Sequence, residues 1–203
     1  MSYINGALKG YLDDLAAKKP APGGGSAAAL AACIGVALLE MVVNYTVGSE
    51  KYKKVADRFK KILKSLQDAR AKLEIFIDED AVVYDKLRAG MKACKPGSQE
   101  LEHLYKESAA VPFGICKVSL ECLKLCGEIE RDGNKNLITD TAIAAIVLEG
   151  AIMSAKYNVY INLKYIKDLS YIETMHKFLS PLEDELPKIK EDILHRCEEV
   201  ISK

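Results

Sequence analysis

Proline is rare in this chain, and its placement constrains the fold more than any other feature. Six prolines occur, at positions 20, 22, 96, 112, 181 and 187, and the long segments between them are rich in Ala, Leu, Lys and Glu. Those residue types favour helices, whereas a proline ends or kinks a helix. No segment alternates strictly between apolar and polar residues, as half-buried strands do. The chain is therefore predicted to be all-α.

We expect about six helices in an antiparallel up-and-down bundle, forming a single domain over residues 1–203. The expected helices cover residues 4–18, 26–47, 50–93, 98–130, 136–166 and 170–202. A bend or break is expected near Pro112, with further disturbance at Pro181 and Pro187. A chain of 203 residues can bury a sizeable core without disulfides or metals.

Charge and composition exclude several classes of protein. Lys+Arg and Asp+Glu both total 29, and this zero net charge argues against a nucleic-acid binder. The N-terminus lacks a basic-flanked apolar segment, so a cytoplasmic protein with reduced thiols is expected. The uncharged run 27–39 is mostly Ala and is followed by Glu40, which favours a buried central helix over a membrane span. The cysteines and histidines lack zinc-ligand spacing, so no metal or cofactor is expected.

The charge is nevertheless unevenly distributed along the chain. Residues 50–74 contain nine basic and four acidic residues, which gives a local excess of five positive charges. One interpretation is an ordinary solvated helix face, and the other is a site for a polyanionic tail.

A glycine-rich turn precedes the second expected helix. Gly23, Gly24 and Gly25 follow two prolines, and Ser26 is a natural N-cap for the helix. Glycines let a ligand approach the backbone, and the free amides of a helix start can bind an anion. The alternative is a tight turn that allows close helix packing.

Two further positions place acids on apolar helix faces. Glu40 and Asn44 lie one turn apart on the second expected helix, and a buried carboxylate there is costly unless it is paired. Asp80 continues an apolar stripe with Leu73 and Phe76, whereas its neighbour Asp78 is expected to face solvent. Glu40 is equally compatible with a partly exposed helix end.

The fifth expected helix has polar residues at both ends of an apolar stripe. Asn134 and Asn136 precede it, Asp140 lies in its first turns, and Asn158 and Asn162 follow on the far side. Asp140 and Asn158 share a face, but 18 residues of helix span about 27 Å. They therefore mark either two sites or one site plus a packing contact. A further hypothesis is that one site is built between subunits. The asparagines can also simply hydrogen-bond to neighbouring backbone.

Four segments in this order resemble the formiminotetrahydrofolate cyclodeaminase and methenyltetrahydrofolate cyclohydrolase family. They are the glycine-rich turn 19–26, the Glu40–Asn44 segment, the acidic stretch ending at Asp80 with Tyr84, and the segment 133–140 leading to 158–162. The resemblance covers about residues 5–200. It implies an all-helical fold, a homodimer, and one-carbon chemistry on a folate substrate that carries one or more glutamates. Cyclodeaminase activity is the first expectation, and the alternatives are cyclohydrolase activity or a non-catalytic folate- or protein-binding bundle.

The resemblance also assigns candidate roles to the polar residues. Both reactions centre on one cationic, amidinium-like carbon, and they need a carboxylate that stabilises charge or moves a proton. Asp140 is the first candidate for that carboxylate, Asp80 the second and Glu40 the third. The candidate substrate-binding residues are Gly23, Gly24, Gly25, Ser26, Asn44, Asn134, Asn136, Asn158 and Asn162.

Overall fold

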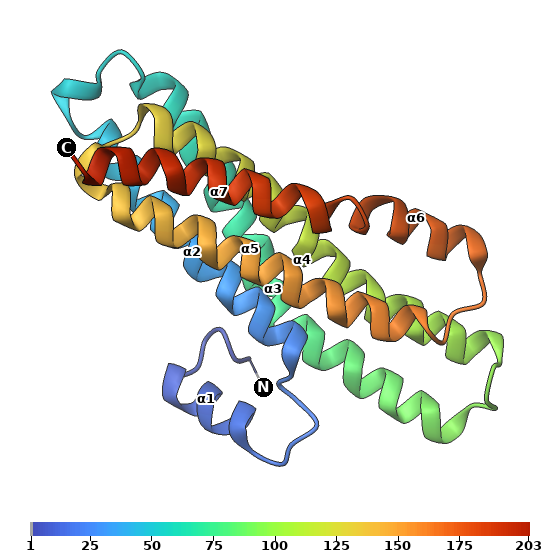
Figure 1. Cartoon of the computed structure of the whole chain (residues 1–203). Coiled ribbons are helices and arrows are strands. Elements are labelled where there is room, and N and C mark those ends of the chain that lie inside the picture. The colour runs from blue at the N-terminus through green and yellow to red at the C-terminus, as the bar shows by residue number, and fades with distance from the viewer. Residues whose placement is uncertain (1) are drawn as a thin grey trace.

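The computed structural model describes residues 2–203, and over that range it is helical with no strand. Seven α-helices follow one another along the chain (Figure 1). They are α1 (Leu8–Ala16), α2 (Gly24–Val47), α3 (Ala56–Ala93), α4 (Gln99–Asp132), α5 (Ile138–Leu163), α6 (Leu169–Leu179) and α7 (Leu182–Ile201). Two short 3-10 turns, η1 (Glu50–Tyr52) and η2 (Lys135–Leu137), precede α3 and α5. The predicted all-α bundle is confirmed.

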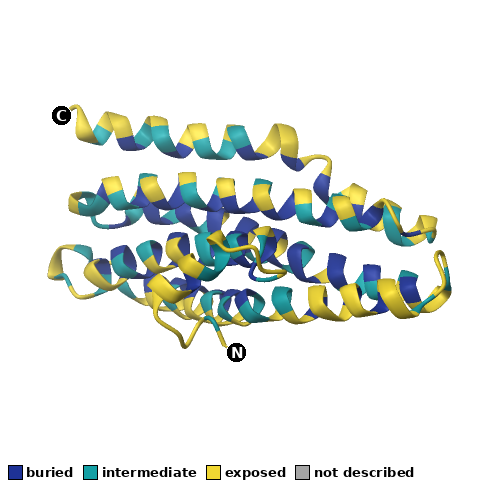
Figure 2. Cartoon of the chain, turned by 90° about the horizontal axis from the view of Figure 1, so that it is seen from below, coloured by how far each residue is buried: buried dark blue, intermediate teal, exposed yellow. Residues whose placement is uncertain are grey.

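The bundle is organised around α2, whose composition is almost entirely apolar. This helix packs against α3, α4 and α5, and α7 lies along α4 and α5 (Figure 1). The amphipathic helices turn their buried residues inward and their exposed residues outward (Figure 2). The start of α2 lies beside the last third of α3 and the last turns of α5, because Gly25 meets Asp80 and Gly24 meets Asn158.

The prolines interrupt the helices less than expected. The predicted sixth helix is divided at Ser180 and Pro181 into α6 and α7, so one expected helix is two. Pro187, in contrast, lies inside a continuous α7, and Pro112 lies inside a continuous α4. Of the bend or break predicted near Pro112, the break does not occur.

The two most apolar helices, α2 and α5, are long and apolar enough to span a membrane by length and composition alone. For α2, burial explains that composition, because most of its residues contact the other helices. A large part of the α5 surface, in contrast, stays uncovered in the single chain.

Candidate functional site

A cavity of about 400 Å³ opens where four helices meet. Its wall combines the start of α2, the last third of α3, the first half of α4 and the last turns of α5. A volume of this size is typical of small-molecule sites. Five of the nine candidate substrate-binding residues line it: Gly23, Gly24, Gly25, Asn158 and Asn162. Asp80 is the carboxylate that joins them.

Asp80 reaches the start of α2 because Gly25 has no side chain. A Cβ on Gly25 would lie 2.1 Å from Asp80 Oδ1 and 2.6 Å from its carboxyl carbon. That approach is possible only for glycine, so the glycine-rich turn serves close packing of a carboxylate against backbone. The backbone N–H of Ser26 donates to Asp80 Oδ2 at 2.9 Å. The two interpretations of the turn, packing and site formation, therefore coincide at one position.

Ser26 lies inside α2 and does not act as the predicted N-cap. The helix begins at Gly24, and the N-cap position is Gly23, which offers no side-chain cap. The fully buried Ser26 hydroxyl instead donates to the carbonyl oxygen of Ile77 at 2.8 Å and lies 3.2 Å from the Tyr11 hydroxyl. Ser26 thus fixes α2 against α3 and α1. The acceptor at this helix start is the protein's own Asp80 carboxyl group, in the place expected for a bound anion.

The surroundings of Asp80 favour its protonated form. Burial raises the pKa of this carboxyl above its ordinary value, and the hydrogen bond from the Ser26 N–H opposes that rise only in part. Among the described residues, no Lys or Arg forms an ion pair with it. A carboxyl whose pKa is shifted toward neutrality in a cavity is suited to general acid and base chemistry.

The two asparagines of α5 present acceptors to the cavity. The Asn158 amide nitrogen donates to the Ser154 carbonyl at 3.0 Å, and the Asn162 amide nitrogen donates to the Asn158 carbonyl at 2.8 Å. The expectation that they bond to neighbouring backbone is confirmed. Among the described residues no donor bonds to either carbonyl oxygen Oδ1, so each oxygen is available to accept from a ligand N–H.

Pro112 contributes to this arrangement from α4. Proline has no N–H, so the carbonyl of Ser108, four residues earlier, loses its helical partner. Asn162 Nδ2 donates to that freed carbonyl at 3.5 Å. The proline that was expected to break the helix therefore provides a contact between α4 and α5 at the cavity.

Several aromatic and apolar wall residues were missed by sequence reasoning. Tyr84, Leu87 and Met91 continue the face of Asp80 at helical spacing, and all three line the cavity. Tyr105 and Tyr165 also line it, and their rings stack with centroids 4.7 Å apart and planes 16° apart. Tyr165 follows Asn162 by three residues. Extending the two polar stripes by one or two turns would have found most of this wall.

Glu40 lies away from the cavity and is paired. Arg70 Nε donates to Glu40 Oε1 at 2.7 Å, and Arg70 Nη1 donates to Glu74 at 2.5 Å. The bond to Glu40 raises the pKa of the Arg70 guanidinium. This arrangement joins α2 to α3. Asn44, one turn further, is exposed to solvent, so the structure does not bring it into the cavity.

Asp140 and its neighbours also lie at this far end of the bundle. The Asn134 N–H donates to Thr46 Oγ1 at 2.9 Å, and Asn134 Oδ1 accepts from the Asn136 N–H at 3.1 Å. Asp140 is half-buried in the first turn of α5. None of these three is among the described residues that line the cavity of their own chain.

The basic stretch of residues 50–74 is, along much of its length, an ordinary solvated helix face. Three of its lysines form ion pairs with acids on the same element, namely Lys53 with Glu50, Lys60 with Asp57 and Lys64 with Asp68. Within residues 2–203, no group of three or more His, Cys, Asp or Glu side chains could hold a metal ion.

Comparison with known proteins identifies the family. The formiminotransferase-cyclodeaminase family profile matches residues 7–180. A methenyltetrahydrofolate cyclohydrolase of Methylorubrum extorquens is 31% identical over 196 residues, which is 93% of this chain and 94% of that protein. A formimidoyltransferase-cyclodeaminase of Mus musculus is 28% identical over 191 residues, 91% of this chain, but the match covers only 35% of the mouse protein.

A solved structure agrees with these sequence matches. The crystal structure of formiminotetrahydrofolate cyclodeaminase from Thermotoga maritima superposes with a TM-score of 0.91 at 29% identity. The match covers 97% of this chain and 98% of that one. The chain therefore belongs to the formiminotransferase-cyclodeaminase family of folate one-carbon enzymes.

Proposed function

We propose that this protein is a formimidoyltetrahydrofolate cyclodeaminase, which converts 5-formiminotetrahydrofolate into 5,10-methenyltetrahydrofolate and ammonia. The observation that carries the proposal is the Asp80 carboxyl, held against the glycine-rich turn in a cavity with its pKa raised by burial. Family membership supplies the substrate class, and the Thermotoga maritima structure bears the same activity in its name.

Asp80 is suited to the proton transfer that this reaction requires. N10 of the folate attacks the carbon of the formimino group, whose nitrogen is protonated, and a new N10–carbon bond forms. The N10 proton passes to the Asp80 carboxylate, which then delivers it to the amino group of the tetrahedral intermediate. The carbon–nitrogen bond breaks, ammonia leaves, and the methenyl cation remains. The Asn158 and Asn162 side-chain oxygens accept hydrogen bonds from the N–H groups of the pterin.

Asp140 enters this proposal through a second subunit. The uncovered face of α5 carries Ile143, Ile146, Tyr157 and Ile161, which are 48%, 49%, 68% and 57% exposed. Other charged groups of α5 are engaged elsewhere, since Glu149 and Lys156 pair with residues of α7. An apolar face of this length is typical of a subunit interface.

A twofold axis across α5 would bring the two ends of the bundle together. In such an interface, residue i of one subunit contacts residue j of the other and the reverse. The midpoint between Asp140 and the Asn158–Asn162 pair is near Gly150, which is exposed and has nothing within 4 Å of a built Cβ. An antiparallel pairing centred there places Asp140 of one subunit beside the cavity of the other. We therefore propose a homodimer with composite sites, in which Asp140 supports Asp80.

Cyclohydrolase activity is the second candidate, because the Methylorubrum extorquens relative matches nearly full-length and carries that name. In that reaction, water attacks the methenyl carbon, and Asp80 would accept a proton from the water. The bond from that carbon to N5 would then break, N5 would take up the hydroxyl proton, and a formyl group would remain on N10. The same carboxylate serves both reactions, so the site geometry does not choose between them.

The two activities differ in products, which gives a direct test. Purified protein is incubated with 5-formiminotetrahydrofolate while ammonia release and the methenyl absorbance in the near ultraviolet are followed. A separate incubation with 5,10-methenyltetrahydrofolate follows loss of that absorbance. Ammonia release with methenyl formation supports the cyclodeaminase. Loss of methenyl without ammonia release from the first substrate would establish the cyclohydrolase, and turnover of neither would contradict both.

A further inference from the structure

A second cavity adjoins the first at the end of the bundle where α3 meets α4. Its volume is about 450 Å³, and it shares Met91, Tyr105 and Tyr165 with the first cavity. Its outer wall comes from the α3–α4 turn and the α5–α6 turn. The two cavities are thus adjacent compartments that meet at the stacked tyrosines, and we call this second one the outer cavity.

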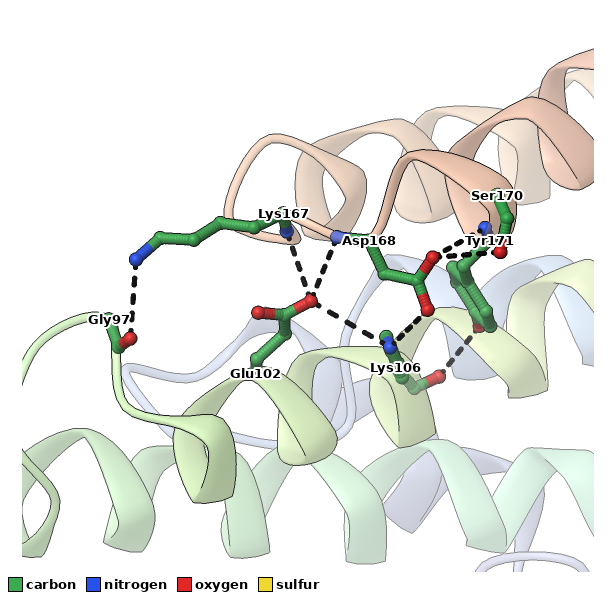
Figure 3. Close-up of polar contacts among 7 residues, drawn as sticks. All are labelled: Gly97, Glu102, Lys106, Lys167, Asp168, Ser170 and Tyr171. Atoms are coloured by element: carbon green, nitrogen blue, oxygen red, sulfur yellow. Dashed lines mark hydrogen bonds and ion pairs between the residues drawn. The ribbon is translucent and has the colours of Figure 1, made fainter.

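Hydrogen bonds join the two turns of the outer wall, and we call this set of bonds the latch. Lys167 Nζ donates to the Gly97 carbonyl at 3.3 Å (Figure 3). Glu102 Oε1 accepts from the backbone N–H groups of Lys167 and Asp168 at 3.1 and 3.0 Å. Gly97 has φ of +75°, and a Cβ there would lie 2.9 Å from Lys167 Nζ. The latch therefore needs glycine in the α3–α4 turn.

The same network leaves the outer cavity with a positive rim. Its charged lining residues are Glu102, Lys164 and Lys167. Glu102 is satisfied by two backbone donors and lies 3.7 Å from Lys106, which also pairs with Asp168 at 2.8 Å. In the described part of the chain, neither Lys164 nor Lys167 forms an ion pair with a carboxylate. Both ammonium groups can therefore donate to an anion that enters this compartment, because Lys167 Nζ uses only one of its three N–H donors on the Gly97 carbonyl.

The adjoining cavities match the layout of a folate along its length. A folate has a pterin at one end, an aminobenzoyl ring in the middle and glutamate carboxylates at the other end. The acceptors and Asp80 lie in the first cavity, the stacked tyrosines at the junction, and the two lysines at the rim beyond. Aromatic faces favour planar rings, and ammonium groups favour carboxylates.

We propose that the outer cavity binds the aminobenzoylglutamate end of the substrate, with the glutamate carboxylates on Lys164 and Lys167. This inference rests on the proposed folate chemistry and fixes the direction in which the substrate lies. It also moves the site for an anionic tail from the basic stretch of α3, which was one interpretation of the sequence, to the α5–α6 turn. None of the lysines of residues 51–72 lines either cavity.

A binding measurement tests this assignment without relying on turnover. Isothermal titration calorimetry is carried out with p-aminobenzoyl-triglutamate, on the wild type and on a Lys164→Glu/Lys167→Glu variant. An exposed ion pair is worth up to about 1 kcal/mol, so reversing both charges is expected to weaken binding about tenfold or more. The matched control is Lys51→Glu/Lys54→Glu, which makes the same charge change on the solvated face and should retain wild-type affinity. Melting curves check that both variants fold.

A kinetic comparison completes the test. The ratio of kcat/KM for a triglutamylated substrate to that for its pteroate analogue, which lacks glutamate, should fall about tenfold in the outer-cavity variant. An unchanged ratio, or an equal fall in the α3 control, would overturn the inference. Tail binding that weakens as expected in a protein that turns over neither folate would contradict the proposed function and leave the tail site standing.

Discussion

A carboxylate lies at each end of α2, and the two carboxylates differ in their hydrogen-bond partners. Near the C-terminal end, Glu40 accepts two hydrogen bonds from Arg70, at 2.7 and 3.3 Å, so a guanidinium neutralises its charge. At the N-terminal end, Asp80 accepts one bond from a backbone N–H, and burial raises its pKa. A paired carboxylate holds two helices together, whereas a buried one without a cation can exchange a proton. Residue type alone does not separate these roles, because the partner decides.

The two ends of the bundle also differ along α5, which carries polar groups at both of its ends. Within a subunit, the Asp140 end of α5 lies about 27 Å from the cavity end. Across an antiparallel dimer, the same separation would place Asp140 of each subunit beside the cavity of the other subunit.

Asp80→Asn is expected to lower kcat/KM for the folate substrate roughly a thousandfold, because it removes the group that transfers the proton. The fold should be retained, since an Asn oxygen can still accept from the Ser26 N–H. Methenyl absorbance and a melting curve are recorded side by side. The adjacent, exposed Glu79→Gln is the control and should keep wild-type turnover. Comparable activity in the two variants would remove Asp80 from the mechanism.

Gly25→Ala is expected to lower kcat/KM about a hundredfold, because a methyl group there would displace Asp80 by an ångström or more. It should also cost about 1–3 kcal/mol of stability through overpacking. Gly23→Ala offers the comparison, since a Cβ at Gly23 meets nothing within 4 Å and φ there is −129°. Kinetics and urea unfolding are measured for both. A Gly23 variant as impaired as the Gly25 variant would show that the whole turn, rather than this one contact, matters.

Arg70→Met is expected to lower the free energy of unfolding by about 2 kcal/mol, because it leaves Glu40 without its charged partner. Turnover per folded molecule should change far less than in the Asp80 variant. Lys64→Met is the control, because its pair with Asp68 is exposed and such pairs contribute little. Urea unfolding measures both variants. A large loss of turnover with unchanged stability would place the Glu40 end in the catalytic machinery of its own subunit.

The smallest effect is in the pH dependence of stability. Because the pKa of Asp80 is raised in the folded protein, the native state holds this proton more tightly than the unfolded chain does. The wild type therefore loses stability from Asp80 as pH rises from the ordinary value through the raised one. The Asp80→Asn variant lacks this loss, so its stability relative to wild type should grow over that range and then level off. A difference that is constant across pH would contradict the assigned shift.

The helices were predictable from sequence because their signals are local. Ala- and Leu-rich segments with helical periodicity determine α2 to α5, and the family segments point to the glycine turn and Asp80. The sequence does not show which acid is paired with a cation and which lies in the cavity. Their partners are distant, because Arg70 is 30 residues from Glu40 and Ser26 is 54 residues from Asp80. The contact beside Pro112 was not predictable for the same reason, since the Ser108 carbonyl that the proline frees accepts from Asn162, which lies on another helix.

We expect each active site to combine Asp80 of one subunit with Asp140 of the other. Mixing two inactive variants in one dimer tests this arrangement. Asp80→Asn and Asp140→Asn proteins, each with strongly reduced activity, are unfolded together in equal amounts and refolded. Random pairing makes half of the dimers mixed, and each mixed dimer regains one intact site of two, so about a quarter of wild-type activity should return. No recovery above the two separate variants, in a sample that sedimentation shows to be dimeric, would contradict the composite site.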